Sequence, residues 1–324
     1  MAKIDIISGF LGAGKTTLIK KLIAEAFQGE KLVLIENEFG EIGIDGGFLK
    51  EAGIQITEMN SGCICCSLVG DFGEALKEVL EKYNPDRVII EPSGVGKLSD
   101  VIKAVQDIGD SVVINSTATV VDASKCKMYM KNYGEFYNNQ IEYAGTVILS
   151  RTQNVSADKL DKCLKMIREK NDEASVITTP WDDINGKNIL DAMEKVNSLE
   201  KELIDEHEHH HEHGEDCGCG HHHDHEHGHH HADDVFTSCG IETAHKFTED
   251  EMKVILEKLS SDHSFGEVLR AKGIVAAEEG EWFHFDLVPE ETEIRRGAAD
   301  YTGRICVIGS NIDEAAIKEL FHVA

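Results

Sequence analysis

Residues 9–17 read GFLGAGKTT, and more of the architecture follows from this segment than from any other. It matches G-x-x-x-x-G-K-[ST], follows the apolar run IDIIS at 4–8 and precedes the helical pattern TLIKKLIAEAF at 17–27. A strand, a glycine-rich turn and a helix in this order let backbone N–H groups converge on phosphate oxygens at the helix N-terminus. The segment therefore predicts a phosphate-binding loop.

Two residues of this loop are expected to act on a bound nucleotide. Lys15 reaches the β- and γ-phosphates, and the Thr16 hydroxyl takes a place on Mg²⁺. The other loop residues expected to contact the phosphates are Gly9, Gly12, Ala13, Gly14 and Thr17.

A second part of the site is predicted at RVIIEPSG, residues 87–94, an apolar strand that ends in Glu91. A carboxylate at the tip of such a strand helps to hold Mg²⁺ or to orient water, and the amide of Gly94 can contact the γ-phosphate. The alternative is that Glu91 merely ends a strand. The nearby loop favours function, so Lys15, Thr16 and Glu91 are the candidate catalytic residues.

The first 200 residues alternate short apolar runs with amphipathic stretches. Strands are expected at KIDIISG, KLVLIEN, DRVIIEP, SVVINSTATVVD and GTVILS. Strands alternating with helices are typical of crossover units, and they predict an α/β fold with a mainly parallel sheet and helices on both faces.

Composition changes abruptly near Lys201. From there to Asp234 the sequence has no aromatic residue, and 13 of the 17 histidines lie between His207 and His231. Such a segment cannot build a core and is expected to be a disordered linker. It divides the chain into a phosphate-loop NTPase domain at 1–200, a linker at 201–234 and a C-terminal domain at 235–324.

The last 90 residues predict a small α+β domain. TSCGIETAHKF is expected to be a strand, and TEDEMKVILEKL opens a helix with a capping box of Thr248 and Glu251. VLRAKGIVAA, the turn EEGE and WFHFDLV predict a hairpin, followed by the strand RICVIG and a helix from about Asp313.

Charge and hydropathy exclude several classes of partner. Sixty acidic against 32 basic residues give a formal charge of −28, which repels nucleic acid and anionic lipid and attracts cations. There is no apolar run of the roughly 18 residues that a membrane span needs, and MAKIDIISGF does not resemble a leader peptide. Nine cysteines are too few for a disulfide scaffold, so a reducing, cytoplasmic location is expected.

Three cysteines cluster in SGCICCS at 61–67, namely Cys63, Cys65 and Cys66. A redox centre would need C-x-x-C opening a helix, and a structural zinc site would need a fourth protein ligand from a second cysteine pair. The favoured interpretation is a transfer site, in which two or three thiolates hold Zn²⁺ or a similar ion and leave an exchangeable position.

The remaining histidines and cysteines fall into two groups. Four cysteines lie in apolar segments and are expected to be small buried hydrophobic residues, namely Cys126, Cys163, Cys239 and Cys306. No ligand role is assigned to the four histidines outside the linker, namely His245, His263, His284 and His322.

The linker imidazoles, mixed with acids and two cysteines, can bind Zn²⁺, Ni²⁺ or Co²⁺ in many combinations. The candidate ligands are His207, His209, His210, His211, His213, Cys217, Cys219, His221, His222, His223, His225, His227, His229, His230 and His231. A plain solvated spacer is the alternative. Metal uptake should fall as pH drops through about 6.5, because protons compete for imidazole.

Together these motifs resemble the CobW-type metallochaperone GTPases. The resemblance rests on GFLGAGKTTL, ENEFGEIGID at 36–45, GCICCSL at 62–68, E-x-x-G at Glu91, VVDA at 120–123, the histidine-rich linker, LRAKG at 269–273 and ICVIGSNIDEAAIKEL at 305–320. It covers nearly the whole chain.

The resemblance implies a GTP-dependent protein that delivers a transition metal to a client metalloenzyme or a corrinoid pathway, with the C-x-C-C thiols as its internal metal site. ENEFGEIGID follows the second strand, where a switch loop can respond to the γ-phosphate. Glu38 and Glu41 are hypothesised to add a carboxylate to the thiols in one nucleotide state only.

One segment departs from the family pattern. Where family members carry N-K-x-D to bind guanine, this chain has Ser150, Arg151, Thr152 and Gln153. A carboxylate accepts hydrogen bonds from both guanine donors, whereas Gln153 has one acceptor oxygen. Arg151 can still lay its stem over a base. GTP is favoured, and ATP or loose base specificity stays an alternative.

Two functions remain open from the sequence. The first is an NTPase that hands a collected metal to a client; the second is a metal buffer whose nucleotide site is not essential. Lys15, Thr16 and Glu91 favour the first, because storage of metal needs none of them.

Overall fold

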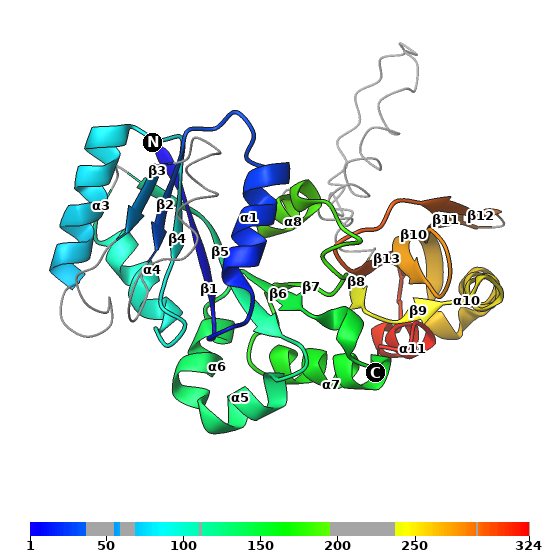
Figure 1. Cartoon of the computed structure of the whole chain (residues 1–324). Coiled ribbons are helices and arrows are strands. Elements are labelled where there is room, and N and C mark those ends of the chain that lie inside the picture. The colour runs from blue at the N-terminus through cyan, green and yellow to red at the C-terminus, as the bar shows by residue number, and fades with distance from the viewer. Residues whose placement is uncertain (37–54, 59–68, 110–111, 195–236, 290, 324) are drawn as a thin grey trace, which may run out of the picture. The chain divides into compact units, whose positions relative to one another are not determined.

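The computed structural model describes residues 1–36, 55–58, 69–109, 112–194, 237–289 and 291–323. The chain divides into two compact units, Met1–Val196 and Asn197–Ala324, which are coloured blue to green and yellow to red in Figure 1.

The N-terminal unit is built on a seven-stranded sheet in the order β3-β2-β4-β1-β5-β6-β7. Every pairing within it is parallel. The strands are β1 (Ala2–Gly9), β2 (Leu32–Glu36), β3 (Gln55–Glu58), β4 (Arg87–Glu91), β5 (Val112–Asp122), β6 (Thr146–Ser150) and β7 (Ser175–Ile177). The mainly parallel sheet expected from the sequence is confirmed, and its central strand β1 leads into the phosphate loop.

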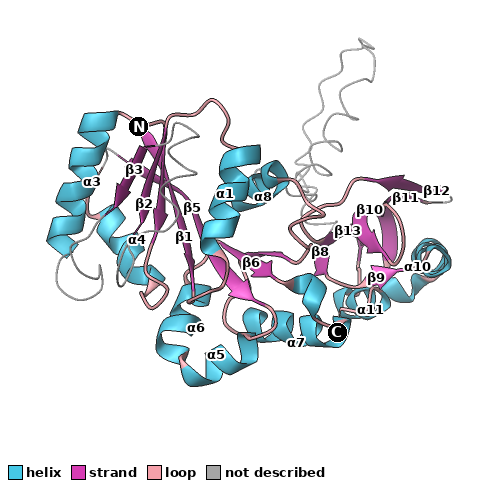
Figure 2. Cartoon of the chain, viewed as in Figure 1, coloured by secondary structure: helices cyan, strands magenta, loops and turns pink. Residues whose placement is uncertain are grey.

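Helices cover both faces of this sheet (Figure 2). They are α1 (Lys15–Glu25), α3 (Val69–Tyr83), α4 (Leu98–Gln106), α5 (Cys126–Asn132), α6 (Gly134–Glu142), α7 (Ala157–Arg168) and α8 (Gly186–Met193). Buried residues of α3, α4, α6 and α7 form one apolar cluster with alternate residues of β1, β2 and β4. Helices α1 and α8 pack against each other on the opposite face. Fully buried parallel strands need such cover, because neither of their faces is polar.

An ionic network fixes the amino-terminal ends of the central strands. Arg87, at the start of β4, forms ion pairs with Asp5, with Glu30 and with Glu194, of which Asp5 is fully buried. Burial by itself would lower the pKa of the Arg87 guanidinium, but Glu30 and Asp5 hold that pKa above its ordinary value. The network lies at the end of the sheet away from the phosphate loop, so its role is structural.

Within residues 237–289 and 291–323, the C-terminal unit consists of a six-stranded sheet and two α-helices. Its main path runs β12-β11-β10-β13-β8 with antiparallel neighbours, and β9 pairs in parallel with β10. The elements are β8 (Thr237–Thr243), β9 (Lys246–Phe247), α10 (Glu249–Ser261), β10 (Glu267–Ala277), β11 (Trp282–Val288), β12 (Glu291–Gly297), β13 (Gly303–Ser310) and α11 (Glu314–Leu320).

Most of this unit agrees with the sequence analysis. The β10–β11 hairpin, the strand β13 and the capping box of Thr248 and Glu251 are confirmed. Strand β12 was not expected, because ETEIRRG is charged and mostly exposed and so lacks an apolar face. It lies at the edge of the sheet, where charged residues are common.

Two further observations concern buried thiols and membranes. The four cysteines Cys126, Cys163, Cys239 and Cys306 are free and buried, as expected. No helix within the described ranges combines the length and the apolar character that a bilayer span requires.

Candidate nucleotide-binding site

The phosphate loop connects β1 to α1 through glycines in left-handed backbone conformations. Gly9, Gly12 and Gly14 have φ angles of 145°, 68° and 109°. Gly9 is also pressed against the neighbouring strand, because a Cβ atom at this position would lie 2.5 Å from the carbonyl oxygen of Val120 in β5. Only glycine meets both demands, so the loop shape depends directly on the sequence pattern.

The loop ends at the N-terminus of α1. Gly14 is the N-cap residue of this helix, and the first turn, Lys15 to Thr17, contains no acidic side chain. The first N–H groups of the helix therefore have neither a capping side chain from Gly14 nor a carboxylate of that turn beside them. Such a helix end attracts anions, since its first N–H groups and the helix dipole act together.

Glu91 reaches this helix end from the tip of β4. Its Oε1 lies 3.4 Å from the Thr16 hydroxyl, which donates to it, and 3.9 Å from Lys15 Nζ. The side chains of Lys15 and Glu91 are mostly buried, with exposed fractions of 10% and 14%. A hydroxyl and a carboxylate oxygen this close are the hard ligands that Mg²⁺ prefers, so the residues fit a nucleotide with Mg²⁺.

The turn after β4 is packed against the phosphate loop. A Cβ at Gly94 would lie 2.9 Å from the backbone nitrogen of Leu11. Behind the turn, the fully buried Gln140 of α6 donates from Nε2 to the carbonyl oxygens of Gly94 and Gly96, at 3.1 and 2.8 Å. Gln140 thus holds the turn in place, a role that no motif in the sequence indicates.

The segment after β6 contacts the loop from the other side. Ser150 Oγ donates to the carbonyl oxygen of Ala13 at 2.7 Å, and Arg151 Nη2 donates to that of Gly12 at 2.9 Å. Arg151 also pairs with the buried Asp122 at the end of β5. The segment 150–153, which differs from the family motif, is therefore joined to the phosphate loop through its first two residues. Gln153 lies exposed in the 3₁₀ turn Thr152–Asn154.

Trp181 is a further residue of this site that sequence reasoning missed. Its indole Nε1 donates to the carbonyl oxygen of Leu149 at 3.0 Å. A Cβ at Gly14 would lie 3.3 Å from its ring atom Cη2. The Trp181 ring therefore packs against the phosphate loop at Gly14. The local sequence around Trp181 carries no motif that predicts this contact.

The predicted ligands of the transition metal lie outside the described residues. This applies to Cys63, Cys65 and Cys66, to Glu38 and Glu41, and to every histidine and cysteine of the linker between His207 and His231. The ligand roles assigned to these residues stay predictions.

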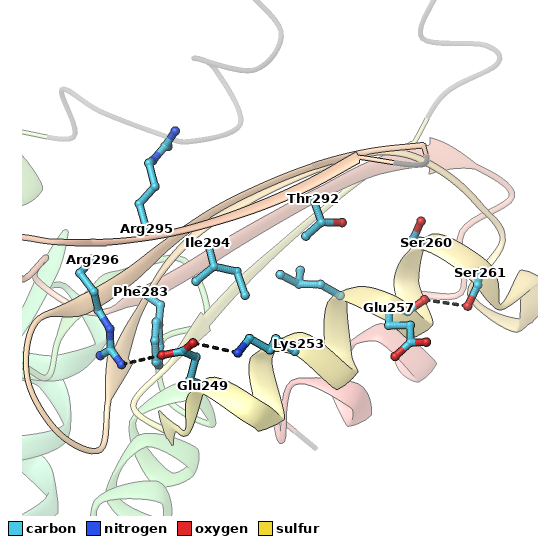
Figure 3. Close-up of a pocket in the computed structure, with 11 residues that line it drawn as sticks. Glu249, Lys253, Glu257, Ser260, Ser261, Phe283, Thr292, Ile294, Arg295 and Arg296 are labelled. Atoms are coloured by element: carbon cyan, nitrogen blue, oxygen red, sulfur yellow. Dashed lines mark hydrogen bonds and ion pairs between the residues drawn. The ribbon is translucent and has the colours of Figure 1, made fainter.

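The C-terminal unit has a groove of its own between α10 and the strands β11 and β12 (Figure 3). At its mouth Glu249 pairs with Lys253 Nζ at 2.8 Å and with Arg296 Nη2 at 3.4 Å. The Arg296 guanidinium lies 3.9 Å from the centre of the Phe283 ring. Because the carboxylate is already neutralised by two cations, we assign the groove no chemistry.

Comparison with known proteins identifies the family. Residues 3–178 match the model for the CobW/HypB/UreG nucleotide-binding domain, which covers more than half of the chain and contains the whole phosphate loop. The chain belongs to this family. Residues 236–324 match the model for the cobalamin synthesis protein cobW C-terminal domain, so the second unit belongs to the CobW type as well.

Three relatives give the range of similarity of this CobW-type chain. It is 42% identical over 128 residues to a protein named zinc chaperone CobW from a Sinorhizobium species, covering 37% of this chain and 36% of the relative. It is 30% identical over 191 residues to the zinc chaperone YjiA of Escherichia coli K12, covering 56% and 58%. The zinc-regulated GTPase metalloprotein activator 1 of Schizosaccharomyces pombe is 26% identical over 208 residues, covering 60% and 50%.

The matched regions span between 36% and 58% of the lengths of these relatives. Among solved structures, Zn(II)-bound YjiA GTPase from E. coli aligns over 99% of this chain and 98% of that chain, with 20% identity and a TM-score of 0.42.

Proposed function

We propose that this CobW-type protein hydrolyses GTP and uses the hydrolysis to control the transfer of a transition metal. The observation that carries the proposal is the convergence of Lys15, Thr16 and Glu91 at the end of the phosphate loop. A protein that only stores metal needs none of these residues, whereas a nucleotide hydrolase needs all three.

Each residue of the phosphate site has a role in this proposal. The backbone N–H groups at Gly12, Ala13 and Gly14 would cradle phosphate oxygens, for which the Ala13 N–H leaves the carbonyl oxygen of Phe10, 3.1 Å away. Lys15 leaves Glu91 to bind the β- and γ-phosphates. Thr16 and Glu91 hold Mg²⁺, which when bound neutralises charge on the phosphates. Gly9, Thr17 and Gly94 complete the pocket, and Gly94 brings its amide to the γ-phosphate.

The base is proposed to be guanine, in keeping with the family. Ser150 and Arg151 keep the base-side segment on the loop through their bonds to Ala13 and Gly12. Gln153 offers guanine one acceptor in place of two, so binding of GTP is expected to be weaker than with an aspartate at this position.

The metal is the cargo of the protein. We assign the internal site to Cys63, Cys65 and Cys66 with Glu38 or Glu41, and a collecting function to the linker histidines. The relatives are named zinc chaperones, which supports Zn²⁺ as the cargo, with Co²⁺ or Ni²⁺ as the alternatives of similar ligand preference. The division into an NTPase domain at 1–200, a linker at 201–234 and a C-terminal domain at 235–324 belongs to the same proposal.

The receiver is proposed to be a client metalloenzyme, or a protein of a corrinoid pathway, in the cytoplasm. Thiolates persist in that reducing compartment, and the excess of acidic residues disfavours nucleic acid and anionic membranes as partners. The competing function is a metal buffer, favoured by the ligand density of the linker alone.

The test measures metal affinity in different nucleotide states. Cobalt bound by thiolates absorbs through a sulfur-to-metal charge-transfer band, so Co²⁺ titration of the full chain carrying Cys217→Ser and Cys219→Ser reports on Cys63, Cys65 and Cys66. We expect the affinity to differ at least tenfold between the GDP form and the form with a non-hydrolysable GTP analogue.

Lys15→Ala is the matched variant. It should abolish hydrolysis and the nucleotide-dependent shift, while the affinity for Co²⁺ without nucleotide stays as in the parent. Equal affinity in all nucleotide states of the parent would leave the metal buffer as the function. A loss of nucleotide-free binding in Lys15→Ala, together with a lower unfolding midpoint, would mean that the variant is misfolded, and Thr16→Ala then takes its place.

A further inference from the structure

Two histidines without an expected role meet a glutamate in the C-terminal unit. His245 lies between β8 and β9, Glu251 in the first turn of α10, and His322 two residues after α11. Their three ligand atoms all lie within 4.8 Å of one another. The three residues, which we call the histidine cluster, come from separate elements spread over 78 positions of the sequence, His245 to His322.

Both imidazoles point the same nitrogen at the same oxygen. His322 Nε2 lies 2.9 Å and His245 Nε2 3.6 Å from Glu251 Oε1. The ring centres are 4.6 Å apart, so the two imidazoles lie side by side next to this carboxylate. With the proton of each ring on Nδ1, both Nε2 lone pairs face the space beside Glu251 Oε1, where a cation would join the three atoms. Ligand atoms around a tetrahedral Zn²⁺ with bonds of 2.0–2.1 Å lie about 3.3 Å apart, so small side-chain movements suffice.

The carboxylate of the cluster is oriented by the helix cap. Glu251 Oε2 accepts a hydrogen bond from the backbone nitrogen of Thr248 at 3.3 Å, while Thr248 Oγ1 accepts from the Glu251 nitrogen at 3.2 Å. One oxygen therefore satisfies the helix N-terminus and leaves Oε1 to face the imidazoles. Outer partners that fix a ligand in this way are typical of metal sites.

Contacts with buried residues and with the backbone hold both imidazoles in place. The His245 ring meets the fully buried ring of Phe247 edge to face, with centres 4.7 Å apart. His322 is held at the end of α11 by its backbone bond to Glu319, in a left-handed conformation with φ of 59°. Side chains of the cluster are between 29% and 48% exposed, which leaves one side open to solvent.

We propose that His245, Glu251 and His322 form a separate metal site that binds Zn²⁺, Co²⁺ or Ni²⁺. Two imidazole nitrogens and one carboxylate oxygen suit these borderline ions better than Mg²⁺ or Ca²⁺, which prefer oxygen ligands. Three protein ligands and an open side leave room for water or for a ligand from a partner, as in zinc sites that exchange ligands. Asp250, Glu319 and Lys258 line a hollow that also includes Glu251 and His322. Its acidic residues outnumber the one lysine, so the net charge there favours a cation.

The site goes beyond the proposed function and does not depend on nucleotide. Its open coordination fits a point at which metal is exchanged rather than locked. We therefore expect it to bind metal equally with GTP, with GDP and without nucleotide, so its failure would leave the test of the phosphate site unaffected.

The experiment follows single histidines in the full chain. Short pulses of diethyl pyrocarbonate modify accessible imidazole, and peptide mass spectrometry gives the rate for each histidine at free Zn²⁺ concentrations fixed by a metal buffer, so that the linker cannot deplete the metal. His263 is the internal control, because it is exposed in the same unit and is no part of the histidine cluster. We expect His245 and His322 to be protected together, at free Zn²⁺ at least tenfold below that which protects His263.

Two variants make the result specific. Glu251→Gln removes the charge but can keep the helix cap, since Gln also serves at this position of a capping box. His245→Ala removes a ligand from a half-exposed loop. Each should raise the free Zn²⁺ needed to protect His322 at least tenfold. Protection of His245 and His322 only together with His263, or protection of His322 that is unchanged in His245→Ala, would overturn the site.

Discussion

The phosphate loop and the histidine cluster position their polar groups in opposite ways. In the loop, the backbone itself is the binding surface, and its shape is set by glycines within one short contiguous segment. In the histidine cluster, three side chains from three elements meet, and the backbone only carries them. A backbone site tolerates almost no change at its glycines, whereas a side-chain site should lose one ligand at a time without loss of the fold.

The largest expected effect is on stability, and it comes from changing a glycine of the phosphate loop. Gly9→Ala would place a methyl group 2.5 Å from the Val120 carbonyl oxygen at a φ of 145°, so strands β1 and β5 would have to separate. We expect the free energy of unfolding of the N-terminal unit to fall by about 3 kcal/mol or more. Urea unfolding followed by Trp181 fluorescence, in a Trp282→Phe background, measures this loss.

The control for that prediction is Gly29→Ala. Gly29 also has a positive φ of 86°, but a Cβ there would meet no described atom within 4 Å. Only the conformational cost remains, about 1 kcal/mol. If the two variants lost equal stability, packing of the loop against β5 would contribute nothing, and the description of Gly9 would be wrong.

The difference between the two sites also explains what the sequence could predict. The strand β1, the loop and α1 are contiguous, so pattern and spacing were enough, and Glu91 was found at the end of the apolar strand β4. His245 and His322 gave no such signal, because neither has a second histidine or a cysteine at helical or strand spacing along the sequence. Their meeting at Glu251 depends on how α10 and α11 pack on the sheet, which is a long-range property.

The same reasoning applies to residues around the loop. Ser150 and Arg151 lie in the segment that departs from the family motif, and their hydrogen bonds join that segment to the loop. Trp181 and Gln140 act through tertiary contacts from loops and helices that carry no motif. Strands β3, β7 and β12 were missed for local reasons: β3 and β7 have only four and three residues, and β12 is a charged edge strand.

A second prediction concerns Gln153, which stands where the family motif has an aspartate. Gln153→Asp restores a carboxylate that can accept from both guanine donors, and the position is exposed, so the fold should be unaffected. We expect affinity for GTP to rise about ten- to a hundredfold, the equivalent of about 1 to 3 kcal/mol. Calorimetric titration with GTP and ATP measures the change.

ATP serves as the control ligand in that titration. Adenine does not present the same pair of donors, so its affinity should change little or fall. A parallel rise for both nucleotides would show that position 153 acts on the phosphates or on the loop rather than on the base.

The smallest expected effect concerns the capping box beneath the histidine cluster. Thr248→Ala removes the hydroxyl that accepts from the Glu251 nitrogen at 3.2 Å, and the C-terminal unit should lose about 1 kcal/mol of unfolding free energy. Glu251→Gln should lose less than about 0.5 kcal/mol, because Gln preserves the reciprocal bond. Urea unfolding followed by Trp282 fluorescence, in a Trp181→Phe background, measures both.

With free Zn²⁺ held constant, stabilisation by the metal should persist in Thr248→Ala and shrink in Glu251→Gln, since Thr248 caps the helix and Glu251 binds the ion. The opposite pattern would mean that the cap, rather than the carboxylate, controls the cluster.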